Sequence, residues 1–213
     1  TFKEVIVIDY EEKAQKNLEK FNTYLAEDPR VEKLNQMYEH FGNQLITAPA
    51  SGKVHYHNAF PGGYLDHVVH VADAAMKVAT VYKAIGGEID FTKQEMIFAA
   101  LHHDLGKLGN EQGPYYLDQD SDWHRKRGEM YKYNENIQYM TVTDRALYIL
   151  QKFEIPVTEK EWIAIKLSDG MYDDGNKAYL KNHSVYPMKT NLPYIIHWAD
   201  HMACSAERDT TKF

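Results

Sequence analysis

The segment His102–Lys107 reads HHDLGK and directly follows the apolar run MIFAAL at Met96–Leu101. Apolar positions before the adjacent pair His103–Asp104 recur at three- and four-residue intervals, which predicts a helix with Asp104 on its buried side. Burying a carboxylate beside an imidazole is costly unless a cation or hydrogen-bond partners compensate them. The pair therefore marks a candidate metal site on an apolar helical segment.

Helical spacing also dominates the rest of the chain. Phe2–Ile8 is the only segment typical of a strand, and a single strand cannot form a sheet. The loops are expected at 47–63 and 169–191, where Gly, Pro, Asp and Asn gather. The sequence thus predicts an all-α fold, with helices over residues 9–25, 28–45, 64–85, 92–105, 122–139, 143–153, 158–168 and from about 193 onward.

Composition limits the class of protein and its partners. The 213 residues carry a formal net charge of −7 and one cysteine, Cys204, so no intramolecular disulfide can form. No stretch is long and apolar enough for a membrane span, and the first residues lack the pattern of a secretory signal. These features predict a cytoplasmic protein with no membrane partner. The acidic balance argues against nucleic acid as the main partner but not against small phosphorylated ligands, because a bound cation supplies local positive charge.

Two further segments place metal-binding side chains on predicted helices. GGYLDH ends at His67, which shares a face with aliphatic residues, and HWADHM contains Asp200 on the inward side of the last helix. Taken alone, His67 is more simply a core histidine bonded to a carbonyl. Taken alone, the last helix is more simply amphipathic, with histidines on its polar face. The agreement of these segments with the His103–Asp104 pair favours a shared metal site.

These motifs resemble the HD-domain superfamily of metal-dependent phosphohydrolases. In that family a histidine in a GG-x-[LY]-x-H context, a consecutive His–Asp and a distal aspartate bind one divalent metal. The resemblance implies that His67, His103, Asp104 and Asp200 are the metal ligands. A bound ion would polarise a phosphoryl oxygen and make hydroxide available near neutral pH. Lys107, in the turn after the pair, is expected to contact phosphate and neutralise its developing charge.

The resemblance also implies a domain organisation. It covers roughly residues 54–204, including the lead-in with His55, His57 and FPGG at 60–63. It implies an HD helical bundle with the metal in the core between helices. We expect one HD domain over residues 1–213, in which residues 54–204 form the core and residues 1–46 form a helical extension packed on it.

The mixed imidazole and carboxylate set suits Mn²⁺, Fe²⁺, Ni²⁺, Co²⁺ or Zn²⁺, with Mg²⁺ as an additional ion. Two-metal relatives add histidines after the HD helix, and His124 resembles the first of them. Ser168-Asp169 stands where many relatives have consecutive histidines, so a single catalytic metal is favoured over two. His124 or Asp169 is then a candidate general acid or base near the metal-bound water.

Candidate substrate contacts lie in the loops and beside His124. Arg125 and Arg127 could attract phosphates, and the alternative is a solvated basic face. Tyr172 and Lys177 could shape a pocket for a base or sugar, and the alternative is an ordinary acidic surface loop. His57 belongs to the lead-in that the resemblance includes, and is a further candidate substrate contact.

Three classes of function remain open. The favoured one is hydrolysis of a phosphate ester or anhydride in a nucleotide-like small molecule, where the nucleotide part rests on family analogy alone. A di-iron oxygenase of HD type would need a full two-iron ligand set, which the sequence at Ser168 does not supply. A noncatalytic HD module that binds nucleotide or metal is disfavoured by the intact four-ligand set. The oligomeric state stays open.

Overall fold

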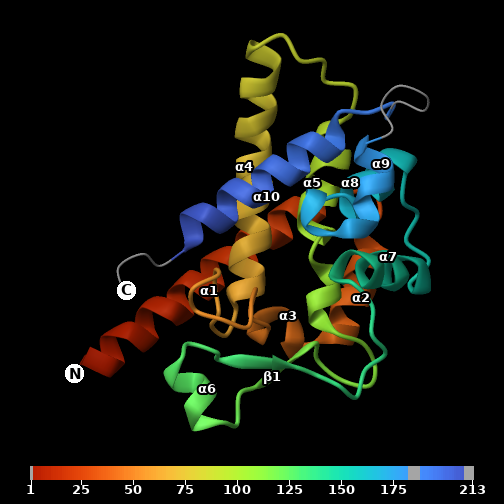
Figure 1. The fold of residues 1–213 in the computed structure, drawn as a ribbon. Helices are drawn as coiled ribbons and strands as arrows, with labels where there is room; N and C mark the ends of the chain where they lie inside the picture. The colour runs from red at the N-terminus through yellow and green to blue at the C-terminus, as the bar shows by residue number, and fades with distance from the viewer. Residues whose placement is uncertain (1, 182–187, 209–213) are drawn as a thin grey trace. The chain divides into compact units, whose positions relative to one another are not determined.

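A computed structural model describes residues 2–181 and 188–208, and these residues are mainly helical, which confirms the all-α prediction (Figure 1). A short β-hairpin is the exception. None of the helices in this part of the chain has the length and apolar character needed to span a membrane. The helices are α1 (Phe2–Ala26), α2 (Val31–Phe41), α3 (Asn43–Thr47), α4 (Gly63–Ala84), α5 (Lys93–His102), α6 (Asp122–Lys126), α7 (Val142–Lys152), α8 (Glu159–Lys166), α9 (Lys177–Lys181) and α10 (Leu192–Glu207), with short 3₁₀ turns η1 (Leu105–Leu108), η2 (Gly170–Tyr172) and η3 (Asp174–Asn176).

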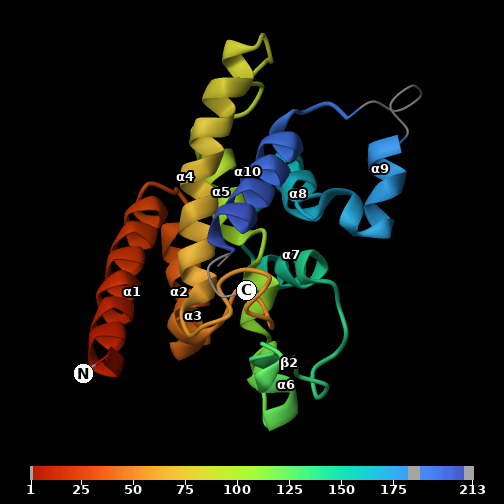
Figure 2. The same cartoon turned by 60° about the vertical axis from the view of Figure 1, so that its left-hand side comes forward.

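The backbone divides into two compact units, each made of segments that are distant in the sequence. Unit 1 comprises residues up to 69, 107–138 and from 207 onward, and unit 2 comprises residues 70–106 and 139–206. Within unit 1, α1 contacts α2 and α2 contacts α3, and all three are visible in Figure 2. Within unit 2, α8 contacts both α5 and α7. Organisation as one domain over residues 1–213 stays a prediction.

In unit 1, α1 is joined to the start of α4 by a half-buried carboxylate, that of Asp66. Asp66 accepts hydrogen bonds from Lys13 Nζ at 2.8 Å, Asn17 Nδ2 at 2.8 Å and Asn58 Nδ2 at 3.0 Å. The loop before α4 also needs Gly63, because a Cβ there would lie 2.0 Å from the carbonyl oxygen of Asn58. These contacts hold the first turn of α4 and the preceding loop in fixed positions.

In unit 2, capping boxes begin two neighbouring helices. Thr92 and Glu95 form one at the start of α5, and Thr158 caps α8 with Glu161 in the same way. The Thr158 hydroxyl also donates to Glu95 at 3.1 Å, which joins the two helix starts. Burial of Ala99, Ala100, Leu101 and Ile165 then forms the core between α5 and α8.

The one candidate strand in the sequence, Phe2–Ile8, is helical, because α1 begins at Phe2. Its β-branched residues favour a strand, yet an isolated strand leaves its backbone groups unpaired, whereas a helix pairs them internally. The two strands of the structure, β1 (Tyr116–Asp118) and β2 (Tyr131–Tyr133), pair antiparallel and were not predicted from the sequence.

Two helix boundaries also differ from those expected. The helix expected over 28–45 is interrupted at Gly42, whose φ of 52° ends α2 before α3 begins. The N-cap of α2 is Arg30, and the Asp28 carboxylate accepts hydrogen bonds from the backbone and guanidinium of Arg30. The helix expected over 122–139 stops at Lys126, and Gly128, with φ of 79°, turns the chain into β2.

The His103–Asp104 pair was expected within a helix. In the structure it lies directly after one. His102 is the last residue of α5 and His103 is its C-cap. The chain then turns into η1, and Gly106 allows a close approach to α7, because a Cβ there would lie 2.1 Å from the carbonyl oxygen of Val142. Both members of the pair are still buried, with 2% and 6% exposure.

Candidate metal centre

Unit 2 brings together three of the predicted ligands. His103 Nε2 lies 3.6 Å from Asp104 Oδ2 and 3.7 Å from Asp200 Oδ1. His103 and Asp104 come from the end of α5, and Asp200 comes from the middle of α10. Two carboxylate oxygens thus face one imidazole nitrogen from segments about a hundred residues apart in the sequence.

The tautomer of His103 follows from its other nitrogen. Nδ1 lies 2.8 Å from the carbonyl oxygen of Ala100, which can only accept, so Nδ1 carries the proton of the neutral ring. Nε2 then presents its lone pair to the carboxylate oxygens, which have no protons to donate when ionised. A lone pair and two anionic oxygens repel each other unless a cation lies among them. The arrangement therefore has the chemistry of a cation site.

The spacing of these atoms also fits a transition metal. Zinc binds nitrogen and carboxylate oxygen at about 2.0–2.2 Å, which separates neighbouring ligand atoms by about 3.0–3.6 Å in octahedral or tetrahedral geometry. The observed separations of 3.6 and 3.7 Å are at or just above this range. Imidazole with carboxylates also matches the ligand preference of Mn²⁺, Fe²⁺, Co²⁺, Ni²⁺ and Zn²⁺. These residues fit a divalent transition metal.

Other side chains of α10 fix the environment of Asp200. Cys204 Sγ donates to Asp200 Oδ1 at 3.3 Å, one helical turn away. His197 Nδ1 donates to the carbonyl oxygen of Ser168 at 2.7 Å, and its ring lies over Gly170, where a Cβ would approach it to 2.4 Å. His197 thus contacts the chain just before and at the start of η2.

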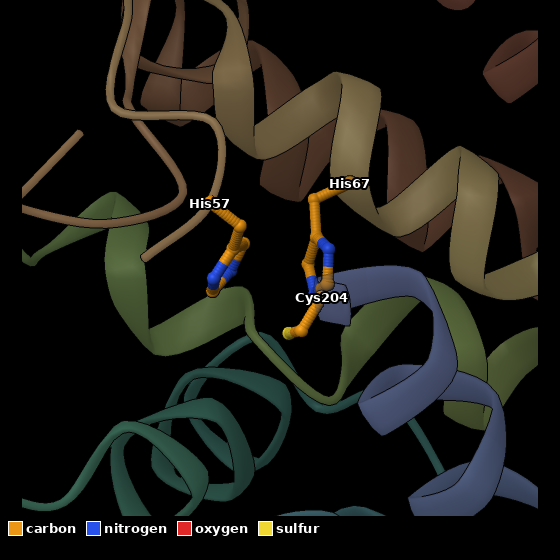
Figure 3. A group of neighbouring side chains, drawn as sticks. All are labelled: His57, His67 and Cys204. Atoms are coloured by element: carbon orange, nitrogen blue, oxygen red, sulfur yellow. The ribbon is translucent and has the colours of Figure 1, made fainter. Parts of the chain in front are cut away.

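His67 lies in the part of α4 that belongs to unit 1, and it is fully buried. Its Nδ1 is 2.9 Å from Glu207 Oε2, with side-chain exposures of only 1% and 6%. The His57 ring lies beside it, with centroids 4.7 Å apart, and Figure 3 shows the two imidazoles next to each other. His67, a predicted metal ligand, and His57, a predicted substrate contact, therefore lie next to each other in unit 1.

The other predicted catalytic side chains lie at three places. Lys107 is a half-buried residue of η1, three positions after Asp104. His124 lies on α6 in unit 1, with Nε2 3.8 Å from Glu129 Oε2. Asp169 in unit 2 directly precedes η2. Roles for these three in catalysis or in binding a second metal stay predictions.

The remaining predicted substrate contacts are engaged locally. Arg125 binds Asp122 and the carbonyl of Gln119, and Lys177 binds Asp174. Arg127 lies over the Trp123 ring at 4.4 Å, in cation–π geometry. Tyr172 is 81% exposed and stacks near His201. These contacts do not decide whether the four side chains bind substrate, and that role stays a prediction.

Sequence reasoning missed two residues that contact predicted ligands. Glu207 is 140 positions from His67, and no motif connects them. Cys204 was noted only for its redox state, although its position four residues after Asp200 on one helix places the two on the same face. The helical spacing could have identified Cys204, whereas nothing in the sequence points to Glu207.

Comparison with known proteins gives one distant relative. No protein family model matches the sequence, and no solved structure matches it. A dihydroneopterin 2',3'-cyclic phosphate phosphodiesterase from Methanocaldococcus jannaschii is 26% identical over 159 residues, which make up 75% of this chain and 52% of the relative. The chain thus spans about half the length of this curated relative.

Proposed function

We propose that this protein is a metal-dependent phosphohydrolase that cleaves a phosphate ester or anhydride of a nucleotide-like small molecule. The observation that carries the proposal is the placement of His103 Nε2 within 3.7 Å of the Asp104 and Asp200 carboxylates. Such a ligand set is suited to a divalent cation, and the distant relative is a phosphodiesterase. The HD-domain superfamily is the proposed family.

The proposed ligands of the cation are His67, His103, Asp104 and Asp200. Imidazole nitrogens and carboxylate oxygens leave coordination positions for water and a phosphate oxygen. When bound, such a cation acts as a Lewis acid toward phosphate and lowers the pKa of a coordinated water. A single catalytic metal is proposed.

The chain's own polar residues are assigned the remaining tasks. Lys107 is proposed to pair with a phosphate oxygen and to offset the negative charge that develops during cleavage. His57, next to the proposed ligand His67, is proposed to donate a hydrogen bond to substrate. His124, beside Glu129, and Asp169 are candidates for proton transfer to the leaving oxygen. Arg125, Arg127, Tyr172 and Lys177 are further proposed substrate contacts.

The proposed substrate class follows the relative. The name of that protein describes a heterocycle with a side chain closed into a 2',3'-cyclic phosphate. A 2',3'-cyclic nucleotide has the same kind of strained phosphodiester beside a flat heterocycle. We therefore propose a cyclic or linear phosphodiester of a nucleotide-like molecule as the first class of substrate to examine.

The test is hydrolysis by the purified chain after metal removal and reloading with Mn²⁺, Fe²⁺, Co²⁺, Ni²⁺ or Zn²⁺. Substrates are 2',3'-cyclic nucleotides, dihydroneopterin 2',3'-cyclic phosphate, nucleoside monophosphates and nucleoside triphosphates. We expect metal-dependent cleavage that is reduced at least 100-fold by Asp104→Ala and unchanged by Glu88→Gln, an exposed carboxylate of unit 2. Full activity of Asp104→Ala would show that the site is wrong. Two irons per chain without hydrolysis of any substrate would instead favour the oxygenase class.

A further inference from the structure

Glu207 and His67 form a buried pair within unit 1. Glu207 Oε2 lies 2.9 Å from His67 Nδ1, and the two side chains retain only 6% and 1% of their exposure. Glu207 is the last residue of α10, and His67 lies in the second turn of α4. A bond so shielded from water is strengthened by its surroundings, and breaking it would leave a buried carboxylate without that partner.

The pair admits two protonation patterns with different consequences for the ring. If His67 is neutral, the carboxylate accepts Nδ1–H, and the lone pair of the ring lies on Nε2. If His67 is charged, both nitrogens carry protons and neither can bind a metal. The second pattern would make the pair a structural salt bridge.

The neutral pattern is the one that a metal ligand requires, and His103 has the same arrangement. His103 also directs Nδ1 toward an acceptor, the carbonyl of Ala100, at nearly the same distance of 2.8 Å. In both histidines Nδ1 lies within hydrogen-bond distance of an acceptor. The lone pair of the neutral ring is then on Nε2. Metal-binding histidines generally donate their second N–H to a carbonyl or a carboxylate in this way.

We propose that Glu207 is a positioning residue that holds His67 in the tautomer with its lone pair on Nε2, ready to bind a divalent cation. The proposal rests on the proposed function, in which His67 is a metal ligand. The carboxylate orients the ring, raises the basicity of Nε2 and adds a negative charge that favours cation binding. A carbonyl acceptor, such as that of His103, orients its ring without adding a charge.

Two variants separate these effects. Glu207→Gln keeps an amide oxygen that can accept Nδ1–H, but it removes the charge. Glu207→Ala removes both the acceptor and the charge. Glu12→Gln, on an exposed side chain of α1 in the same unit, is the matched control. Thermal unfolding of each variant verifies that it is folded.

The first measurement is the tautomer of His67 in the metal-free full chain, read from long-range ¹H–¹⁵N correlations of its imidazole at pH 8. We expect a protonated Nδ1 and an unprotonated Nε2 in the wild type. This signature is expected to persist in Glu207→Gln and to become a mixture of tautomers in Glu207→Ala. A ring protonated at both nitrogens, or at Nε2 alone, in the wild type would overturn the proposal.

The second measurement is the affinity for Zn²⁺, Co²⁺ and Mn²⁺ by competition with a chromophoric chelator. Removing the partner of a metal-binding histidine typically weakens affinity 10–100-fold. We expect that loss for Glu207→Ala, a smaller loss for Glu207→Gln and no change for Glu12→Gln. If both Glu207 variants bind metal as tightly as the wild type, the proposed role of Glu207 is overturned, but the proposed function is not. Absence of metal binding by the wild type would overturn the proposed function, and the role of Glu207 with it.

Discussion

The cation site predicts an unusual stability pattern for Asp200→Asn. The substitution preserves the size of the side chain, and the amide oxygen can still accept the Cys204 thiol bond seen at 3.3 Å. It removes one of the two carboxylates that lie within 3.7 Å of His103 Nε2. We expect the variant to be at least as stable as wild type without metal, and less stable than wild type with metal.

The magnitudes follow from the geometry and from binding linkage. Since both oxygens lie close to one nitrogen, they are at most about 7.3 Å apart, and two charges at that distance repel by about 2 kcal/mol at an effective dielectric of 20. Relief of this repulsion offsets the loss of other contacts of Asp200. A metal at 100 times its dissociation constant stabilises the folded wild type by about 2.7 kcal/mol, or roughly 5–10 °C in a chain of this size.

The assay is thermal unfolding with Zn²⁺, with Mn²⁺ and with excess chelator. We expect the metal to raise the unfolding temperature of wild type and of the control Glu88→Gln, and chelator to reverse the rise. Asp200→Asn is expected to lose most of the metal-dependent increase. If Asp200→Asn is destabilised equally with and without metal, Asp200 is structural, and the cation argument is refuted.

Three further predictions concern the elements around the site. In Gly106→Ala, the added Cβ would lie 2.1 Å from the carbonyl oxygen of Val142. The variant is expected to lower the free energy of unfolding by at least about 1–3 kcal/mol, measured by urea titration. Thr158→Ala removes the cap of α8 and the bond to Glu95 and is expected to cost about 1–2 kcal/mol, measured in the same way. Burial alone would raise the pKa of Glu95, but hydrogen bonds from Thr92 and Thr158 outweigh it and lower that pKa. Because the folded pKa lies below the unfolded one, this stabilisation is present above the unfolded value near 4.3 and is lost as pH falls through the folded value. Glu95→Gln is therefore expected to lose less stability than wild type between pH 6 and pH 3, and an equal loss would contradict the assignment.

Local sequence signals predicted most helices and several of their ends. Two examples are the capping box of Thr92 and Glu95 and the end of α4 before Gly86. Each depends on residues only a few positions apart, so a single sequence reveals it. The hairpin was missed because each of its strands has only three residues, and their pairing joins Tyr116 to Tyr133 across a loop. Strands that short show no periodicity, and their pairing is not local.

The same distinction applies to the candidate site. The HD dipeptide and the spacing of Asp200 on its helix are visible in the sequence, and the structure places both carboxylates within 4 Å of His103 Nε2. Contacts that support ligands, such as that of Glu207 with His67, depend on packing between distant segments. Residue types alone therefore suggest ligands but not the groups that orient them.

The end of α5 places the HD pair beside carbonyls that the helix itself no longer uses. Inside a helix, the carbonyl of Ala100 would accept the amide of Asp104, four residues later. Because α5 ends at His102, its last carbonyls lack intrahelical partners, and the His103 ring can donate Nδ1–H to Ala100. That bond directs Nε2 toward Asp104 and Asp200. The His103 ring thus bonds to one of the last carbonyls of α5, and the close approach of Gly106 to α7 places the turn that follows.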